Sequence, residues 1–492
     1  MIGPSRTRLI VSTLLVFFLQ ASRGFADAGP TGQPAREVKN DGAFSFDSAF
    51  RYRLEYVDWY HAKDKPSNDP YLFEHTKLNL GAKFHQDFFT AYAQGQYFQL
   101  LDLPDSGTGT GANYNLNNEG KRNPGGVILR QAYLAIDRQI GTPLLRAAGG
   151  RMLYANGMEI QNSSPEIEAI KKNRIANRVL GSFDFTAGRS FDGGLVSLSE
   201  KSFGGVAGGF FHPTQGGFSA DGGVEITHID IGTASATYGQ PILGTASEAQ
   251  LFYYYYDDNR DNTTKVDNRP LELRQSELSA IEIHNVGAHW IESYKLDEVA
   301  VDTLFWGILQ SGRWGSDNVL AGAFAAESGL SFPKIACTPA LRFGYWYGSG
   351  DSNPGDKTHS TFFQMFPTGR QYALSPFYNM MNNQDTFAEL EAKPADDWST
   401  HFGLHFLQLS SVHDLFYSGS GANLSEGQFG YSGLPVYAKT IGLLLDSGVS
   451  YRLNSYLGAS LYYGHLFPGG SFEDQLGSAE VDYGFLEINA KY

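Results

Sequence analysis

The chain has 492 residues, a formal net charge of -15 and one cysteine, Cys337. The acidic balance argues against nucleic acid as a partner, because phosphate binding needs clustered lysine and arginine. A single cysteine excludes an intramolecular disulfide, so stability must come from packing and backbone hydrogen bonds. We expect no cofactor.

The first residues predict a secretory signal peptide. Two arginines precede an apolar run from Leu9 to Leu19, and small residues follow. A spanning helix needs about 20 predominantly apolar residues, so this run fits a membrane anchor less well than a cleaved signal. Cleavage after Ala26, with Ala28 as the alternative, makes residues 1–26 the signal peptide and residues 27–492 the mature domain.

The mature chain has no second apolar stretch long enough to cross a bilayer as a helix, and the mean hydropathy of the full chain is -0.28. Because lipid leaves no partner for open backbone groups, a membrane protein of this composition would have to be a closed barrel. Aromatic residues make up 14% of the chain and there are 57 glycines. Barrels use such residues in interfacial girdles and at bends.

Apolar and polar residues alternate from Phe44 to Tyr56, with Arg51 and Arg53 on the polar face. A period of two over about 9–11 residues predicts a strand between lipid and a polar lumen. Residues 77–86 and 89–97 continue the alternation and predict a hairpin with a very short connection. Later strands are expected at 341–348, 441–452 and 483–492, with an apolar face of Ile441, Leu443, Leu445, Val449 and Tyr451 in the second.

Segments rich in Gly, Asn, Asp and Ser separate these strands and predict loops at 105–126, 257–270, 348–360 and 418–433. Outer-membrane barrels alternate short periplasmic turns with longer external loops, which fits this spacing. The length accommodates about 16–20 strands. A soluble all-β protein is the alternative, but the apolar faces stay aromatic-rich throughout and no blade-length repeat is found. We therefore predict one all-β domain, a transmembrane antiparallel β-barrel.

Several segments resemble the alginate-export family of outer-membrane barrels. The most specific are SGDSNPGD and FFQMFPTGRQYA, and LRQAYLAID, GGRM, RSFDGG, HDLFYSGSGA and FGYSG are similar to that family too. The resemblance covers most of the mature chain. It implies an export pore of about 18 strands in the bacterial outer membrane, with a narrow, arginine-rich lumen that passes an anionic polysaccharide.

The polar strand faces give the first candidates for the solute path. With those faces inward, the lumen receives Arg51, Arg53, Lys77, Lys83 and Arg342, with Asp446 and Glu487 among their acidic neighbours. A carboxylated polymer in a low-dielectric constriction needs compensating positive charge, and arginine binds carboxylates in a bidentate manner. The alternative is that these basic residues pair with carboxylates of the lumen itself.

Four more arginines are candidates. The resemblance carries over Arg151 from the glycine-arginine segment and Arg370 from PTGRQYA as pore residues. Arg130 shares an alternation face with Leu134, which would turn it toward lipid unless a β-bulge intervenes. Arg189 begins RSFDGG, where a strand entry is expected, and its direction is open.

Two other segments allow more than one interpretation. Asp351 to Asp356 offers oxygen ligands but lacks the spacing and distal glutamate of a calcium loop, so a solvated turn is expected and no metal. The segment 358–385 does not alternate cleanly, and predicts either a plug folded into the pore or an external loop packed on the rim. His401 and His405 share a strand face, and no nucleophile elbow or zinc spacing accompanies them, so we expect no enzyme.

These observations predict a passive outer-membrane channel for a hydrophilic, anionic solute. The alternative is a general porin for small hydrophilic nutrients or ions, because a few lumen side chains and loops tune a pore's substrate. The expected partners are outer-membrane lipid, an anionic polysaccharide or small solute, and periplasmic export components.

Overall fold

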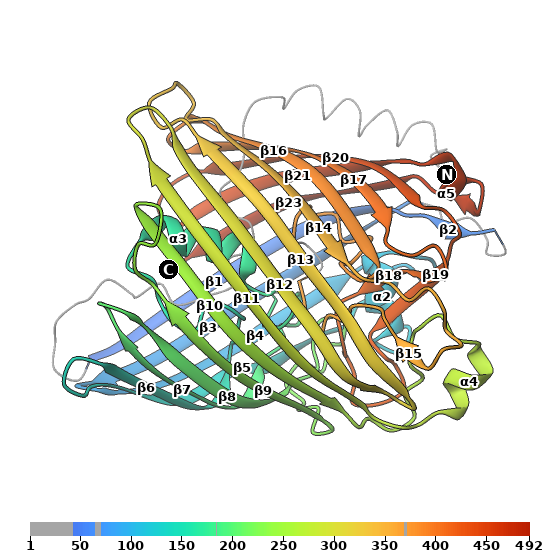
Figure 1. The fold of residues 1–492 in the computed structure, drawn as a ribbon, viewed down its shortest axis with the longest axis horizontal. Helices are drawn as coiled ribbons and strands as arrows, with labels where there is room; N and C mark the ends of the chain where they lie inside the picture. The colour runs from blue at the N-terminus through green and yellow to red at the C-terminus, as the bar shows by residue number, and fades with distance from the viewer. Residues whose placement is uncertain (1–42, 64–69, 184, 369–370) are drawn as a thin grey trace.

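Eighteen long strands close into one antiparallel barrel (Figure 1), as expected from the sequence. The computed structural model describes residues 43–492 apart from 64–69, 184 and 369–370. Each strand pairs with the next long strand of the chain, and β1 (Ala43–Asp58) closes the barrel against β23 (Val481–Lys491). The predicted signal peptide, residues 1–26, lies outside the described residues.

The other wall strands lie between these two in chain order. They are β3 (Tyr71–Gln86), β4 (Phe89–Leu101), β5 (Gly125–Gln139), β6 (Leu144–Met152), β7 (Phe191–Glu200), β8 (Gly204–Pro213), β9 (Ile229–Tyr238), β10 (Ala246–Asp258), β11 (Ile281–Lys295), β12 (Ala300–Trp314), β13 (Asp317–Ser331), β14 (Ala340–Gly348), β16 (Asn383–Ala395), β17 (Trp398–Leu409), β20 (Thr440–Arg452) and β21 (Leu457–Pro468).

Short elements occupy the connections. They are β2 (His61–Ala62), α2 (Thr110–Leu116), α3 (Pro165–Ile170), the π-helix η1 (Lys171–Ile175), α4 (Leu271–Ser276), β15 (Thr358–His359), β18 (Leu415–Gly419), β19 (Tyr431–Pro435), α5 (Gly470–Glu473) and β22 (Leu476–Ser478). None of the helices in the described part of the chain has the length and apolar character needed to cross a bilayer.

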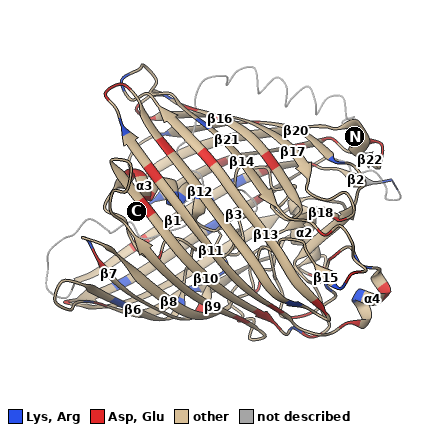
Figure 2. Ribbon diagram, in the orientation of Figure 1, with Lys and Arg blue, Asp and Glu red and all other residues tan. Residues whose placement is uncertain are grey.

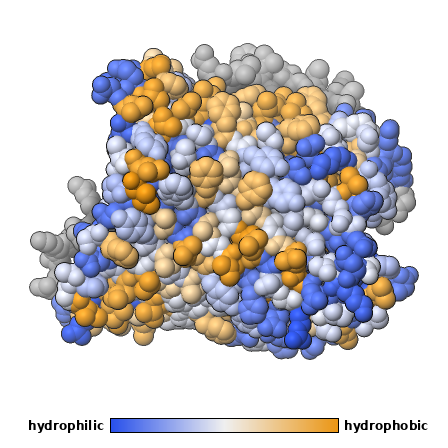
Figure 3. Space-filling view, in the orientation of Figure 1, coloured by the Kyte–Doolittle hydropathy of each residue, from blue (hydrophilic) through white to orange (hydrophobic). Residues whose placement is uncertain are grey.

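The predicted alternation sets the two faces of the wall. On β1, Phe44 and Phe46 are 70% and 72% exposed on the outside, whereas Arg51 and Arg53 are buried inside. The register continues this division, since Arg51 lies opposite Lys77 of β3. Apolar side chains are spread over the outer wall (Figure 3), and charged residues lie on the strands as well as in the connections (Figure 2).

The two ends of the barrel differ in their connections. At the end near the C-terminus, here the turn end, strands are joined closely, as by Asp87 and Phe88 between β3 and β4. Asp87 has a φ of 51°, the left-handed conformation that such a tight turn uses. The opposite end, here the loop end, carries the long connections 102–124, 153–190, 214–228, 259–280, 349–382 and 410–439.

One predicted strand face is wrong at one position. Ile441 was expected on the lipid face of β20 with Leu443, but it is fully buried. Leu407 pairs with Gly442 and Gln408 pairs with Thr440, which leaves Ile441 as an extra residue. Such a bulge shifts the phase of alternation by one residue and turns Ile441 inward.

The described residues of 358–382 fold into the lumen, whereas residues 383–385 of the predicted segment begin the wall strand β16. Phe362, Met365 and Phe366 have no exposed surface, and the Phe363 backbone N–H donates to Gln310 Oε1 of β12 at 2.8 Å. Asn285 of β11 contacts the Met365 sulfur at 3.8 Å. These contacts with inward strand residues decide between the two alternatives in favour of a folded plug.

Candidate solute path through the barrel

The connection of residues 153–190 runs the length of the lumen. It leaves β6 at the loop end, yet Asn162 donates to the backbone oxygen of Ser247 at 3.1 Å, beside the first residue of β10 at the turn end. Glu166 of α3 pairs with Lys295, the last residue of β11, at 2.6 Å. Ser164 caps α3 by accepting from the Ile167 N–H, and Figure 1 shows α3 near the C-terminal end of the barrel.

Three cations hold this connection against the wall. Lys171 Nζ lies 3.1 Å from Glu248 Oε2 of β10, and Arg178 Nη2 lies 3.3 Å from Glu327 Oε1 of β13. Between them, Arg174 Nη1 donates to Glu389 Oε1 of β16 at 3.1 Å. Burial alone would lower the pKa of Arg174, but the neighbouring carboxylates raise it above its ordinary value.

The sequence interpretation missed these three residues. They belong to the run KKNRIANR, where four basic residues fall within eight positions of a segment without strand alternation. That concentration of basic residues in a connection was the feature of the sequence that could have identified them as candidates. Their carboxylate partners stand singly on three separate strands, so nothing local in the sequence marks the pairs.

The candidates on β1 and β3 point inward and are engaged with the protein. Arg53 Nε donates to Glu487 Oε2 of β23 at 2.5 Å, and Arg51 Nε lies 3.8 Å from the same oxygen. Lys77 donates to the backbone oxygen of Phe185 at 3.2 Å, while Lys83 is partly exposed. The arginines therefore pair with a lumen carboxylate, which is the alternative to an anion path.

Arg342 and Asp446 are also inward. Arg342 Nη2 donates to Asp302 Oδ1 at 2.6 Å, and its Nη1 lies 3.5 Å from Glu327. Asp446 lies 3.1 Å from His401 Nε2 and accepts from the Tyr462 hydroxyl at 2.9 Å. These residues share the lumen but occupy separate clusters, Arg342 beside two carboxylates and Asp446 beside a histidine and a tyrosine.

A bulge turns Arg130 inward. Gln94 pairs with Gln131 and Gly95 with Leu129, which leaves Arg130 as the extra residue of β5. Its guanidinium donates to Ser190 Oγ at 3.0 Å and also contacts the backbone oxygen of Arg189. The side chain is therefore buried against the connection of residues 153–190 and does not face lipid.

The structure places three further candidate arginines differently. Two of them, Arg151 and Arg370, were assigned by the family resemblance, and the direction of Arg189 was left open by the sequence. Arg189 is fully buried between connections and donates to backbone oxygens of Ser420 and Ala422, so it does not line an open path. The register pairs Arg151 with Asp192, on the face that carries the lipid-exposed Val196. The lumen position predicted for Arg151 is thus corrected to the outer rim. Arg370 lies outside the described residues.

Asp351 and Asp356 form turns, but only Asp356 is exposed, and the solvated turn expected at Asp351 is corrected because that residue is buried. Asp351 Oδ1 accepts from the Asn353 N–H at 2.9 Å, and Asp356 Oδ1 accepts from the Thr358 N–H at 2.8 Å. These are local contacts of the kind that Asp makes in turns. The described residues contain no group of three or more His, Cys, Asp or Glu side chains placed to hold a metal.

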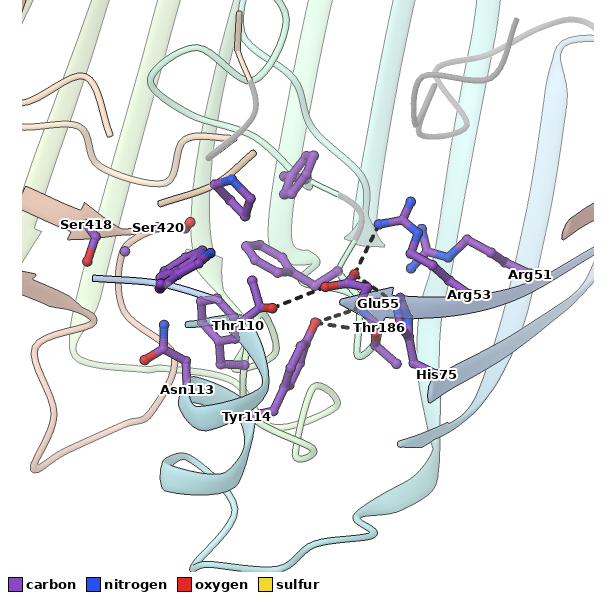
Figure 4. Close-up of a pocket in the computed structure, with 16 residues that line it drawn as sticks. Arg51, Arg53, Glu55, His75, Thr110, Asn113, Tyr114, Thr186, Ser418 and Ser420 are labelled. Atoms are coloured by element: carbon purple, nitrogen blue, oxygen red, sulfur yellow. Dashed lines mark hydrogen bonds and ion pairs between the residues drawn. The ribbon is translucent and has the colours of Figure 1, made fainter. Parts of the chain in front are cut away.

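A cavity lies between the wall and the connections that fold into the lumen, here the in-folded connections (Figure 4). The wall supplies Arg51, Arg53 and Glu55 from β1, and His75 from β3. The opposite side comes from α2 and five connections, and five of its twelve lining residues are aromatic. Its described lining residues there are Trp59, Thr110, Asn113, Tyr114, Phe183, Phe185, Thr186, Phe218, Pro376, Ser418, Gly419 and Ser420.

Hydrogen bonds organise the polar side of the cavity. Glu55 Oε1 accepts from His75 Nε2 at 2.9 Å, and Glu55 Oε2 accepts from Thr110 Oγ1 at 3.1 Å. Because a carboxylate only accepts, Nε2 of His75 carries a proton. His75 Nδ1 lies 2.7 Å from Thr186 Oγ1, and the Tyr114 hydroxyl donates to the same oxygen at 3.3 Å. The barrel wall and two separate connections thus share one network.

Known proteins were compared in sequence and in fold. The family model for alginate export matches residues 232–485. A BenF-like porin from Pseudomonas fluorescens Pf-5 superposes with a TM-score of 0.54 and 11% identity, over 91% of this chain and 98% of that chain. OccK2 (OpdF) from Pseudomonas aeruginosa, in complex with glucuronate, superposes with a TM-score of 0.52 and 10% identity, over 91% and 96%. At these identities the likeness establishes the barrel fold alone. No curated protein matches the sequence.

Proposed function

The chain belongs to the alginate-export family of outer-membrane barrels, and on that premise we propose that it is a pore for passive transport of a hydrophilic, anionic saccharide. It is a channel and not an enzyme, with outer-membrane lipid around its wall and periplasmic export components as further partners. Its family and fold are those of transport channels.

The presence of several guanidiniums inside one lumen carries this proposal, although each of them is paired with a carboxylate of the protein. Arg53 with Glu487 lies at the seam of β1 and β23, whereas Arg342 with Asp302 and Arg174 with Glu389 form a second group, in which Arg342 lies opposite Glu389 in the strand register. A passing carboxylate can take the place of the wall's own carboxylate at each guanidinium. Such exchange keeps binding weak and distributed over many sites, which a conducting pore requires.

A general porin for small hydrophilic nutrients or ions is the second candidate. The same ion pairs favour it, because a guanidinium and a carboxylate at contact distance cancel most of each other's field at longer range. A lumen balanced in this way selects weakly between anions and cations. The size and hydroxyl pattern of a solute would then determine its permeation more than its charge does.

Reversal potentials in planar bilayers under a potassium chloride gradient separate the candidates. We expect anion selectivity that weakens when Arg51, Arg53 or Arg342 is replaced by alanine, because each change leaves lumen carboxylates in excess. Arg151→Ala is the matched control, since Arg151 lies at the outer rim. Cation selectivity, or selectivity unchanged in all three lumen variants, would rule out the anionic cargo and leave a general porin.

A further inference from the structure

One of the in-folded connections, that of residues 410–439, contains a small β-hairpin. β18 and β19 pair with each other, and residues 420–430 form the tip between them. Two arginines from other connections, Arg189 and Arg260, donate hydrogen bonds to oxygens of this tip. The position of the tip therefore depends on two side chains that belong to other parts of the chain.

Arg260 holds the second half of the tip as a neutralised ion pair. Its Nε donates to Asp258 Oδ1 at 2.9 Å, and its Nη2 donates to Asp258 Oδ2 at 2.8 Å. Its Nη1 also donates to the backbone oxygen of Leu424 at 3.1 Å. Phe429 packs beside it against Trp314, with ring centroids 5.6 Å apart. This half of the tip is thus fixed by a balanced pair and by aromatic packing.

Arg189 holds the first half of the tip without a counterion. It has no exposed surface, and it donates to the backbone oxygens of Ser420 at 3.2 Å and Ala422 at 2.5 Å and to Asn423 Oδ1 at 3.2 Å. In the described part of the chain no carboxylate pairs with Arg189, and its Nε has no hydrogen-bond partner. Burial lowers the pKa of Arg189 from 12.5 to about 10, so the guanidinium is still charged at neutral pH. A buried charge without a counterion is unfavourable.

The cavity beside the hairpin has no room for a solute while the tip lies in this position, here the closed form. Its volume is about 30 Å³, enough for about two water molecules. Ser418, Gly419 and Ser420 of the hairpin form part of its lining, on the side away from Arg51 and Arg53 (Figure 4). A saccharide therefore needs the tip to move before it can occupy this part of the lumen.

We propose that Arg189 is an anion-sensing residue: residues 420–423 of the tip open, and a carboxylate of the solute keeps them open by binding the guanidinium that they release. The solute then supplies the counterion that the closed form lacks. A guanidinium binds a carboxylate through two parallel hydrogen bonds, which neutral carbonyl groups do not match. Because the solute binds the open form alone, the ratio of open to closed form rises with its concentration. This rests on the proposed function, since an anionic solute must enter the lumen.

The tip is the part that moves, and Arg189 stays in place. Arg130 of β5 contacts the backbone oxygen of Arg189 and donates to Ser190 Oγ at 3.0 Å, so the wall holds this arginine. Gly419 and Gly421, with φ values of 108° and 87°, lie where the first half of the tip begins. Glycine allows backbone conformations on both sides of φ, and hinges are built from a few such loop positions.

The test measures the opening of the tip by cysteine labelling of the purified protein in detergent. In a Cys337→Ser background, Ala422→Cys places a thiol where the closed form leaves 2% of the side chain exposed, so a maleimide reacts with it when the tip opens. Relative to sodium chloride, sodium glucuronate at about 100 mM should raise the labelling rate about fivefold, as a Kd of about 25 mM gives. Methyl β-D-glucopyranoside, which has no carboxylate, should leave the rate unchanged. Glu426→Cys, at an exposed position of the same tip, is the matched control and should label equally in all three solutions.

Two variants of Arg189 test the role of its charge. Arg189→Gln keeps a donor for the tip and removes the charge, so the Ala422→Cys thiol should label at one rate with and without glucuronate. Arg189→Lys keeps the charge and should retain the response. A response that persists in Arg189→Gln, an equal response to the glucopyranoside, or no response to glucuronate in a protein that conducts ions would overturn the anion-sensing role. A response in a protein that conducts no ions would retain this role and overturn the pore. Gel mobility and circular dichroism establish that each variant is folded.

Discussion

Arg174 lies on the connection between β6 and β7, and it pairs with Glu389 on β16, 215 positions away in the sequence. Removing one partner of a buried ion pair costs about 3–5 kcal/mol, because the other charge stays behind. We expect Arg174→Gln and Glu389→Gln to release the connection from the wall. Single-channel recording should then show higher conductance or more frequent opening.

The control for this pair is Arg452→Gln. Arg452 pairs with Asp397 at 3.0 Å near the turn end, but both side chains are more than half exposed. Exposed pairs contribute about 0–1 kcal/mol, so conductance should stay unchanged. Equal conductance and equal protease protection of residues 153–190 in all three variants would show that the ion pair does not hold the connection.

The wall could be predicted from the sequence more completely than the site. A strand between lipid and a polar lumen must alternate, so β1, β3, β4 and β23 follow from the pattern alone. The alternation fails at Arg130 and Ile441, because each is an extra residue whose effect depends on the partner strand's register. A single sequence does not contain that register.

The lumen contents depend on pairs that are distant in sequence. Arg51 and Arg53 were predicted inward from their own strand, but their partner Glu487 lies at the other end of the chain. Lys171 and its connection have no alternation that would place them against Glu248. Placing them requires tertiary contacts, which explains why the plug segment 358–385 was predicted only as one of two alternatives.

Acid should tighten the packing of the connection that carries Asp414. Burial raises the pKa of this carboxyl from 3.8 to about 6, although Thr361 and Tyr417 donate hydrogen bonds to it. Because the pKa is higher in the folded state than in the unfolded state, protonation of Asp414 stabilises the fold. This contribution to the free energy of unfolding is fully present below pH 3.8 and is lost as the pH rises through 6. The difference is on the order of 3 kcal/mol. Asp414→Asn should abolish it.

Protonation of His359 changes the folding stability in the opposite direction, so its effect must be measured separately from that of Asp414. Burial lowers the pKa of this imidazole from 6.5 to about 4, so its contribution is present above pH 6.5 and is lost as the pH falls through 4. His359→Phe keeps an aromatic ring against Trp314, which stacks on it at 4.1 Å. Urea midpoints between pH 4 and pH 7 should rise on acidification in His359→Phe and fall in Asp414→Asn. If the urea midpoint changed with pH in the same way in both variants, neither the raised pKa of Asp414 nor the lowered pKa of His359 would be supported.

The lipid face should respond to charge according to depth. Leu309 lies near the middle of β12 and is 72% exposed on the outer wall, while Val127 is 77% exposed near the loop end of β5. Arginine costs about 2–4 kcal/mol at the centre of the bilayer and about 0–1 kcal/mol near its surface. Leu309→Arg should therefore lower the folding free energy in vesicles much more than Val127→Arg. Equal losses would place Leu309 outside the hydrocarbon region.

Cys337 tests the orientation of the barrel. It is exposed in the connection between β13 and β14, at the turn end, which the length rule for connections assigns to the periplasm. We expect a maleimide attached to a polyethylene glycol too large for the pore to label Cys337 only after the outer membrane is permeabilised. A Cys337→Ser variant with a new cysteine at Ser425, in the connection of residues 410–439, should label on intact cells. The reverse labelling pattern would show the opposite orientation, with the loop end of the barrel on the periplasmic side.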